Sequence, residues 1–254
     1  RSVAVIGASN RPDRVGTVVM RNLVAGGFAG AIYPVNPKYD QVQGFRAYTR
    51  PDELPAPPDL AIVCTPPATV PDLVGRLGER GTRAAVVITA GMTSLLDEHH
   101  RSLTQVMLEA AKPHMLRILG PNCIGLLVPG IGLNASFAHT HARAGNIAFI
   151  SQSGALVTAV LDWARSHRIG FSHFVSIGEG ADVDIADLID YLGSDAGTRA
   201  ILLYLESIWT ARKFVSAARP AARPPTAEEA GGDAWDGEGD AARDLPDLHH
   251  AGVD

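Results

Sequence analysis

The feature that most constrains the fold is the alternation of short apolar runs with amphipathic segments. In residues 1–125, each apolar run has four or five residues and is followed within three residues by Gly or Pro, whereas the segments between carry apolar residues at helical spacing. Apolar strands separated by helices are typical of a parallel sheet covered on both faces. The pattern therefore predicts an α/β domain. The predicted strands are 2–6, 31–35, 60–64, 84–88 and 116–119, and the predicted helices are 15–25, 70–79 and 102–111.

The same alternation restarts further along the chain. Residues 147–223 are predicted to form a second, smaller α/β domain. The connecting segment 126–146, with loops at Pro129–Asn134 and His139–Asn146, is predicted to be a hinge. Residues 224–254 have no apolar period, so we expect them to be disordered, because they bury too little surface to offset their ordering entropy. The predicted strands are 147–150, 171–177 and 200–205, and the predicted helices are 151–165, 183–192 and 210–222.

Charge and cysteine content exclude several classes of protein. The whole chain has a net charge of −5, but residues 224–254 hold nine acidic side chains and one Arg. Residues 1–223 hold 21 basic and 18 acidic side chains, a net charge of about +3, which suits a small anionic ligand and is too low to indicate nucleic acid. No apolar run approaches the ~18 residues of a membrane span, and no secretory signal is apparent. Two cysteines without a CxxC pair predict neither disulfides nor a metal site, and are typical of the cytoplasm.

The loop after the first predicted strand is a candidate binding site, because ligands of open α/β sheets bind at the carboxyl ends of strands. Glycines let the backbone approach a phosphate closely, and the helix that follows offers free N–H groups. The loop lacks the GxGxxG pattern, so a plain strand-to-helix turn is an equal interpretation. The candidate residues here are Gly7, Ala8, Ser9, Asn10, Val15 and Gly16.

The second strand end separates ligand classes. An NAD-binding domain usually places Asp or Glu there, to bind the ribose hydroxyls. This chain has Asn36 and Lys38 instead, and a cation suits a ribose that carries a phosphate, as in coenzyme A or NADP. A solvated surface lysine is the alternative interpretation.

The later strand ends extend the candidate site. Thr65-Pro66-Pro67 would form a rigid apolar lip for an adenine or a pantetheine arm, and Thr89-Ala90-Gly91 ends in a glycine that permits close approach. Asn122 and Cys123 close the domain. We interpret the Cys123 thiol as buried and structural, because no His lies near it in the sequence.

Taken together and in this order, these segments resemble the NDP-forming acyl-CoA synthetases. That family includes the ADP-forming acetate–CoA ligases and the α subunit of succinyl-CoA synthetase. The resemblance covers nearly all of residues 1–223. It implies a Rossmann-type CoA-binding domain at 1–125 and a flavodoxin-like, succinyl-CoA-synthetase-like domain at 147–223. The segments that carry it are Val3–Gly16, Tyr33–Lys38, Ile62–Val70, Val86–Met92, Gly120–Gly125, Leu133–Phe137, Gly145–Leu156, Ala181–Ile185 and Thr198–Ser207.

The resemblance also implies roles in CoA binding. In this family CoA, an acyl group and a phosphate exchange through an acyl phosphate, and a catalytic His carries the phosphoryl group to ADP or GDP in an ATP-grasp domain. By resemblance, Ser9, Asn10 and nearby backbone bind the CoA phosphates. Lys38 faces the nucleotide, and Thr89–Gly91 line the pantetheine path.

The second domain would hold the phosphoryl group. Ser151, Ser153 and Gly154 match the family's phosphate-binding helix, and a helix N-terminus suits an anion because its N–H groups are unpaired. The simpler interpretation is a serine N-cap. Glu206 matches the glutamate that steadies the phospho-His, and the alternative is a surface acid at a strand end.

The chain departs from the family where catalysis is completed. The catalytic His would follow another strand after the last predicted helix, but Pro224 begins the acidic tail instead, as a truncation or a reading-frame change would produce. His249 and His250 lack the expected setting and are not assigned. ADP or ATP and Mg would bind only through an absent ATP-grasp domain or β subunit. We expect CoA and a small carboxylic acid or acyl phosphate as ligands, an oligomer with that partner, and no turnover by this chain alone.

Two alternatives stay open. A non-catalytic CoA-binding regulatory module would keep the pocket, although it would have no need of the Ser151–Gly154 turn. An NADP-dependent oxidoreductase is compatible with Lys38, but the GxGxxG pattern and a placed proton donor are missing.

Overall fold

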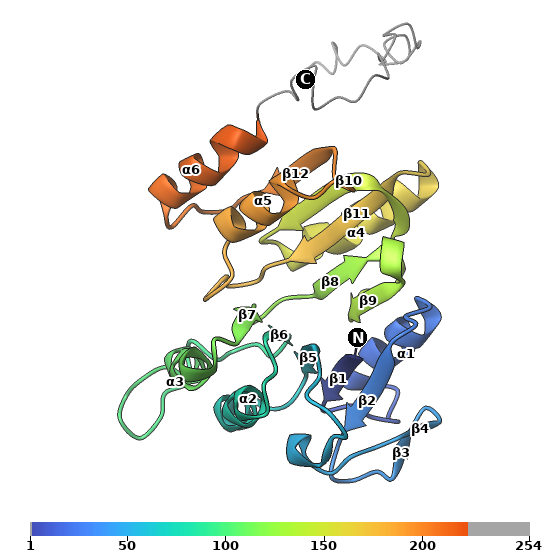
Figure 1. Cartoon of the computed structure of the whole chain (residues 1–254), viewed down its shortest axis with the longest axis vertical. Coiled ribbons are helices and arrows are strands. Elements are labelled where there is room, and N and C mark those ends of the chain that lie inside the picture. The colour runs from blue at the N-terminus through green and yellow to red at the C-terminus, as the bar shows by residue number, and fades with distance from the viewer. Residues whose placement is uncertain (1, 223–254) are drawn as a thin grey trace, which may run out of the picture. The chain divides into compact units, whose positions relative to one another are not determined.

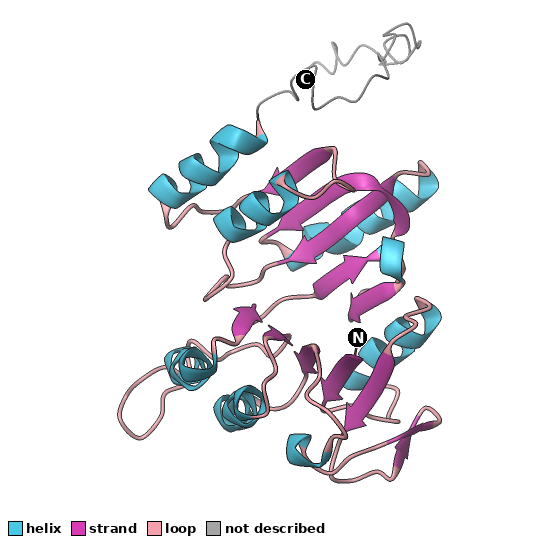
Figure 2. Ribbon diagram, in the orientation of Figure 1, coloured by secondary structure: helices cyan, strands magenta, loops and turns pink. Residues whose placement is uncertain are grey.

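The computed structural model describes residues 2–222, of which residues 2–221 belong to one compact unit. This part of the chain contains two five-stranded sheets, one following the other in sequence, each flanked by helices (Figures 1 and 2). The predicted α/β class and the predicted division into a Rossmann-like and a flavodoxin-like sheet are confirmed. The disorder predicted for 224–254, and His249-His250 within that tail, lie outside the described residues.

The first sheet is entirely parallel, with the order β2-β1-β5-β6-β7. The chain moves from β1 to β2 and then returns to add β5 on the other side of β1, so strand addition reverses between β1 and β5. Ligands of open α/β sheets bind at the carboxyl edge of such a reversal. The elements are β1 (Ser2–Ile6), α1 (Val15–Ala25), β2 (Ala31–Val35), β5 (Leu60–Val63), α2 (Val70–Glu79), β6 (Ala84–Val87), α3 (Leu103–Ala111) and β7 (Arg117–Leu119).

The two faces of the first sheet bury different helices. Side chains alternate along a strand, so Val3 and Val5 of β1 pack in the cluster that contains α1, whereas Ala4 and Ile6 pack with α2 and α3. This two-sided burial explains why the strands are apolar at nearly every position. Shorter elements complete the domain: β3 (Gln41–Val42), β4 (Phe45–Arg46), η1 (Pro51–Glu53), η2 (Pro67–Thr69) and η3 (Lys112–His114).

The second sheet is mixed, with the order β12-β10-β11-β8-β9. Its first three strands are parallel, and β8 and β9 add an antiparallel pair. The helix α4 packs on one face, and α5 and α6 pack on the other. The elements are β8 (Gly125–Val128), η4 (Pro129–Ile131), β9 (Leu133–Ser136), β10 (Arg143–Ser151), α4 (Gly154–Ser166), β11 (Gly170–Ser176), α5 (Ile185–Gly193), β12 (Ala200–Tyr204) and α6 (Ala211–Ala221).

The connecting segment corrects one prediction. We expected loops at Pro129–Asn134 and His139–Asn146, but β9 covers Leu133–Ser136 and β10 already begins at Arg143. Residues 126–146 are therefore largely part of the second sheet. The polar side chains misled the prediction, because Asn134 and Ser136 are buried in β9 and satisfy each other through a hydrogen bond from Ser136 Oγ to Asn134 Oδ1 at 2.6 Å.

Specific hydrogen bonds join the two sheets. The buried Asn22 amide of α1 donates to the carbonyl oxygens of Ser136 at 2.9 Å and Ala138 at 2.8 Å. The Arg117 guanidinium at the start of β7 contacts Asp182 and Asp187 at 3.1 Å. These contacts keep the carboxyl edges of both sheets beside a shared pocket. None of the helices within residues 2–222 is long and apolar enough to cross a membrane.

Candidate functional site

Two glycines shape the end of β1. Gly7 has a φ of +92°, and a Cβ there would lie 3.0 Å from the Cys64 carbonyl oxygen. A Cβ on Gly16 would lie 2.1 Å from the Gly7 carbonyl oxygen, so α1 can start against this loop only with glycine at that position. No side chain caps the first turn of α1. The Thr17 and Val18 N–H groups donate to the Arg14 carbonyl oxygen, which leaves the N–H groups of Val15 and Gly16 for an anion.

A pocket of about 930 Å³, here called the β1–β5 pocket, lies at the reversal point of the first sheet. Its location follows from the topology, because parallel strands leave their carboxyl ends on one edge. Eight of the predicted site residues line it: Gly7, Ser9, Val15, Gly16, Asn36, Lys38, Thr65 and Pro66.

Lys38 is the cation of this pocket with the fewest competing partners. Its side chain is exposed, and no ion pair engages it within residues 2–222. Four arginines that the sequence analysis missed also line the pocket, and each faces a carboxylate: Arg11 and Arg14 pair with Asp13, Arg50 with Glu53, and Arg76 with Asp72 and Asp52. Strand-end rules point to the first residues after a strand, so they did not identify Arg50 in a later loop or Arg76 on α2, whereas Arg11 and Arg14 lie in the β1–α1 loop and were passed over for its glycines.

Of the two predicted asparagines of this region, Asn36 lines the β1–β5 pocket and Asn10 does not. Asn36 donates to the Ala8 carbonyl oxygen at 2.7 Å and accepts from the Lys38 N–H at 2.9 Å. Asn10 instead bonds the β3–β4 hairpin, donating to the Gln41 carbonyl oxygen at 2.9 Å and accepting from the Gln43 N–H at 3.1 Å. Five of the predicted residues lie outside the lining of both pockets: Ala8, Asn10, Pro67, Gly91 and Ser151.

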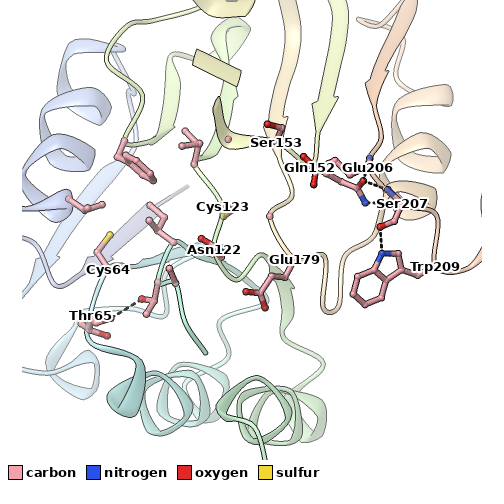
Figure 3. Close-up of a pocket in the computed structure, with 18 residues that line it drawn as sticks. Cys64, Thr65, Asn122, Cys123, Gln152, Ser153, Glu179, Glu206, Ser207 and Trp209 are labelled. Carbon is pink, nitrogen blue, oxygen red and sulfur yellow. Dashed lines mark hydrogen bonds between the residues drawn. The ribbon is translucent and has the colours of Figure 1, made fainter. Parts of the chain in front are cut away.

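A second pocket of about 670 Å³, here called the central pocket, is lined by both sheets (Figure 3). Thr89, Ala90, Asn122 and Cys123 contribute from the first domain. Ser153, Gly154 and Glu206 contribute from the second. Val15, Cys64 and Thr65 line both pockets, so the β1–β5 pocket and the central pocket meet at these three residues.

Both cysteines line the central pocket, where Cys64 is half-buried and also lines the β1–β5 pocket, whereas Cys123 is buried. Burial raises the pKa of the Cys64 thiol to about 12, with a smaller contribution from the neighbouring Cys123. Burial likewise raises the pKa of Cys123 to about 12. The Cys123 thiol is 3% exposed and donates to the Val87 carbonyl oxygen at 3.5 Å, as expected for a structural residue. Both side chains are therefore neutral at pH 7.

The two serines in the turn before α4 have different structural roles. Ser151 is fully buried, and its hydroxyl donates to the Ser153 carbonyl oxygen at 2.9 Å and accepts from the Ser153 N–H at 3.0 Å. Ser153 is the N-cap of α4, accepting from the Leu156 N–H at 3.4 Å. Ser153 and Gly154 line the central pocket, whereas Ser151 lies behind it. Ser151 thus shapes the turn, and the start of α4 faces the pocket.

The turn after β12 forms the part of the pocket wall that adjoins the turn before α4. Figure 3 shows Gln152, Glu206, Ser207 and Trp209 close together, joined by hydrogen bonds. Glu179 also lines the pocket and accepts a hydrogen bond from Thr93. Within residues 2–222, the lining of the central pocket contains no Lys, Arg or His. Gln152, Glu179, Ser207 and Trp209 were not predicted, because their grouping depends on how distant strands align.

The comparisons with known proteins agree with this architecture. The profile of a CoA-binding domain matches residues 1–129, and that of a succinyl-CoA ligase-like flavodoxin domain matches residues 144–226. Among curated relatives, the ADP-forming acetate–CoA ligase II α subunit of Pyrococcus furiosus is 42% identical, over 86% of this chain and 47% of its own length. An ADP-forming acetate–CoA ligase of Archaeoglobus fulgidus is 40% identical, over 87% of this chain and 32% of its own length.

A solved structure extends the similarity to three dimensions. The dinucleotide-forming acetyl-coenzyme A synthetase 1 of Ca. Korarchaeum cryptofilum, in complex with phosphate and ADP, superposes with a TM-score of 0.81. It is 36% identical, and the match covers 87% of this chain and 47% of that one. The chain thus spans about half the length of its α-subunit relatives and about a third of the longer ones. It belongs to the NDP-forming acyl-CoA synthetase family, of which it carries the CoA-binding domain and the succinyl-CoA ligase-like flavodoxin domain.

Proposed function

We propose that this chain is the CoA-binding and acyl-transfer part of an ADP-forming acid–CoA ligase. The observation that carries the proposal is the junction of the two pockets at Val15, Cys64 and Thr65. CoA is a long molecule with a charged nucleotide at one end and a thiol at the other. A single route from a cation-lined pocket to a helix N-terminus suits such a ligand.

Different residues along this route bind different parts of the CoA molecule. Lys38 and the open start of α1 bind the phosphates of the nucleotide end. Thr65, Thr89 and Ala90 line the path of the pantetheine arm. The CoA thiol then reaches the start of α4, where Ser153 and Gly154 hold the phosphate of an acyl phosphate. There the sulfur attacks the acyl carbon, the carbon–oxygen bond to phosphate breaks, and inorganic phosphate leaves with the bonding electrons and takes up the proton of the thiol.

The complete ligase requires parts that other polypeptide segments supply in the relatives. Two similar proteins are named as α subunits of acetate–CoA ligases. By analogy, we propose a partner ATP-grasp domain or β subunit that binds ADP or ATP with Mg, an oligomeric enzyme, and a cytoplasmic location. Glu206 would steady the phospho-His of the complete enzyme.

One observation favours a second candidate, a CoA-binding regulatory module. No histidine within residues 2–222 lines either pocket, so the described residues bring no phosphoryl carrier to the site. Such a module would bind CoA without transferring its acyl group.

Calorimetric titration of the purified chain with CoA, dephospho-CoA and NADPH tests the proposal. We expect CoA to bind, dephospho-CoA to bind more weakly because it lacks the phosphate that faces Lys38, and NADPH not to bind. Release of acetyl phosphate from acetyl-CoA and inorganic phosphate would then support the transferase part over the regulatory module. Failure of CoA to bind would refute both candidates.

A further inference from the structure

Gln152 follows β10 and lies opposite the end of β12. The two strands are parallel neighbours, with Ser151 paired to Tyr204. The Gln152 N–H extends this ladder by donating to the Tyr204 carbonyl oxygen at 3.2 Å. The register therefore places the Gln152 side chain beside the residues that follow β12.

The Gln152 carboxamide engages the backbone of that turn through both of its polar atoms. Its Oε1 accepts from the Glu206 N–H at 2.5 Å and from the Ser207 N–H at 3.0 Å. Its Nε2 donates to the Ser207 carbonyl oxygen at 2.9 Å. Only a primary amide presents an acceptor and a donor side by side in this way, so a carboxylate of the same length would lack the donor and would repel the Ser207 carbonyl.

The turn has few other attachments. Residues 206–210 are exposed and belong to no helix or strand. Within residues 2–222, no other side chain bonds the backbone of Glu206 or Ser207. The remaining hydrogen bonds lie further along, from the Trp209 indole N–H to Ser207 Oγ and from Thr210 Oγ1 to Asp184 at 3.2 Å. The position of the Glu206 backbone thus depends on Gln152.

This dependence bears on the site, because Glu206 and Ser207 line the central pocket together with Ser153 and Gly154 (Figure 3). Gln152 belongs to the same turn as Ser153, and its side chain hydrogen-bonds the backbone of Glu206 and Ser207 in the turn after β12. We propose that Gln152 is a positioning residue, whose carboxamide sets the place of the Glu206 carboxylate relative to the N-terminus of α4. The role of the Glu206 carboxylate in catalysis rests on the proposed function, whereas the hydrogen bonds from Gln152 to the turn are tested independently of it.

The test measures the turn directly in the full chain, with Trp163→Phe and Trp235→Phe introduced so that Trp209 alone reports by fluorescence. In Gln152→Ala we expect amide hydrogen exchange at Glu206 and Ser207 to accelerate at least tenfold, while the β10 and β12 amides keep their protection. The Trp209 emission maximum should shift, because Ser207 is its hydrogen-bond partner. The Kd for CoA should stay within twofold of the parent value.

A matched control separates positioning from general loss of stability. Gln105→Ala removes a glutamine whose amide oxygen caps α3, far from the turn, and should leave both the exchange at 206–207 and the Trp209 emission unchanged. Gln152→Leu, which keeps a side chain of similar size and removes both the acceptor and the donor, should reproduce the Gln152→Ala exchange and emission changes, and it serves if the alanine variant fails to fold.

The outcomes are distinct. Unchanged exchange at Glu206 and Ser207 in Gln152→Ala or Gln152→Leu would overturn the proposal. A tenfold or larger loss of CoA affinity without faster exchange would also overturn it, since Gln152 would then contact the ligand instead. A parent chain that does not bind CoA would refute the proposed function, and the exchange data would still decide the role of Gln152.

Discussion

The two strand-to-helix junctions to which we assign ligand binding, β1–α1 and β10–α4, differ in their chemistry. The β1–α1 junction has no side-chain cap, is shaped by Gly7 and Gly16, and lies in a pocket with five cationic side chains. The β10–α4 junction is capped by Ser153 and faces a pocket that contains Glu179 and Glu206. An uncapped helix start among cations suits a permanently charged group. A capped start beside carboxylates suits a phosphoryl group that binds briefly and leaves.

The largest expected effect concerns Cys64 and Cys123, the two cysteines that line the central pocket. Because burial raises both pKa values to about 12 from the usual 9.0, the thiolate population at pH 8 should fall by up to about 10³-fold, and so should alkylation by iodoacetamide. Mass spectrometry of the native and urea-unfolded chain measures this rate. Alkylation of either cysteine at the unfolded rate would contradict the raised pKa of that thiol.

The same thiols give a pH dependence of stability. Each pKa is raised in the folded state, so folding favours the neutral thiol, and its contribution is fully present below the unfolded pKa near 9. Stability should therefore decline from about pH 9 upward. Denaturant titrations at pH 8 and pH 10 should show a smaller decline in Cys64→Ala than in the parent chain, and an equal decline would count against Cys64 as a cause.

The next effect tests whether glycine geometry governs the β1–α1 junction. Gly16→Ala would place a Cβ 2.1 Å from the Gly7 carbonyl oxygen, and overpacking of this kind costs about 1–3 kcal/mol or more. We expect Tm to fall by several degrees and CoA binding to be lost, measured by calorimetry. Gly130→Ala is the control, since no atom lies within 4 Å of its added Cβ. Equal losses in both variants would contradict a local clash.

A smaller effect tests the charge difference between the pockets. Lys38→Ala should weaken CoA binding about tenfold, or about 1.4 kcal/mol, and leave dephospho-CoA binding unchanged. Lys112→Ala removes an exposed lysine that does not line the β1–β5 pocket, and its CoA affinity should match the parent. If both ligands lost affinity equally in Lys38→Ala, the lysine would not face the distinguishing phosphate.

The two junctions also differ in how far the sequence predicts them. The β1–α1 site follows from local patterns: Val15–Ala25, Ala31–Val35 and Val70–Glu79 begin and end where predicted, since each apolar period stops at a clear breaker. The β1–β5 pocket then follows from the strand-end rule. In the central pocket, Gln152 meets Glu206 only through the β10–β12 register. Register depends on long-range packing, which no local period reports.

The smallest effect separates capping from ligand binding at α4. Ser153→Ala removes the N-cap hydroxyl and should lower the free energy of unfolding by about 1 kcal/mol. Ser102→Ala removes an equivalent cap from α3, outside both pockets, and should cost a similar amount. Of the two, only Ser153→Ala should also slow acetyl phosphate formation from acetyl-CoA and phosphate. If both variants lost stability and neither lost rate, Ser153 would serve as a cap alone, and the phosphate would depend on the backbone N–H groups of α4.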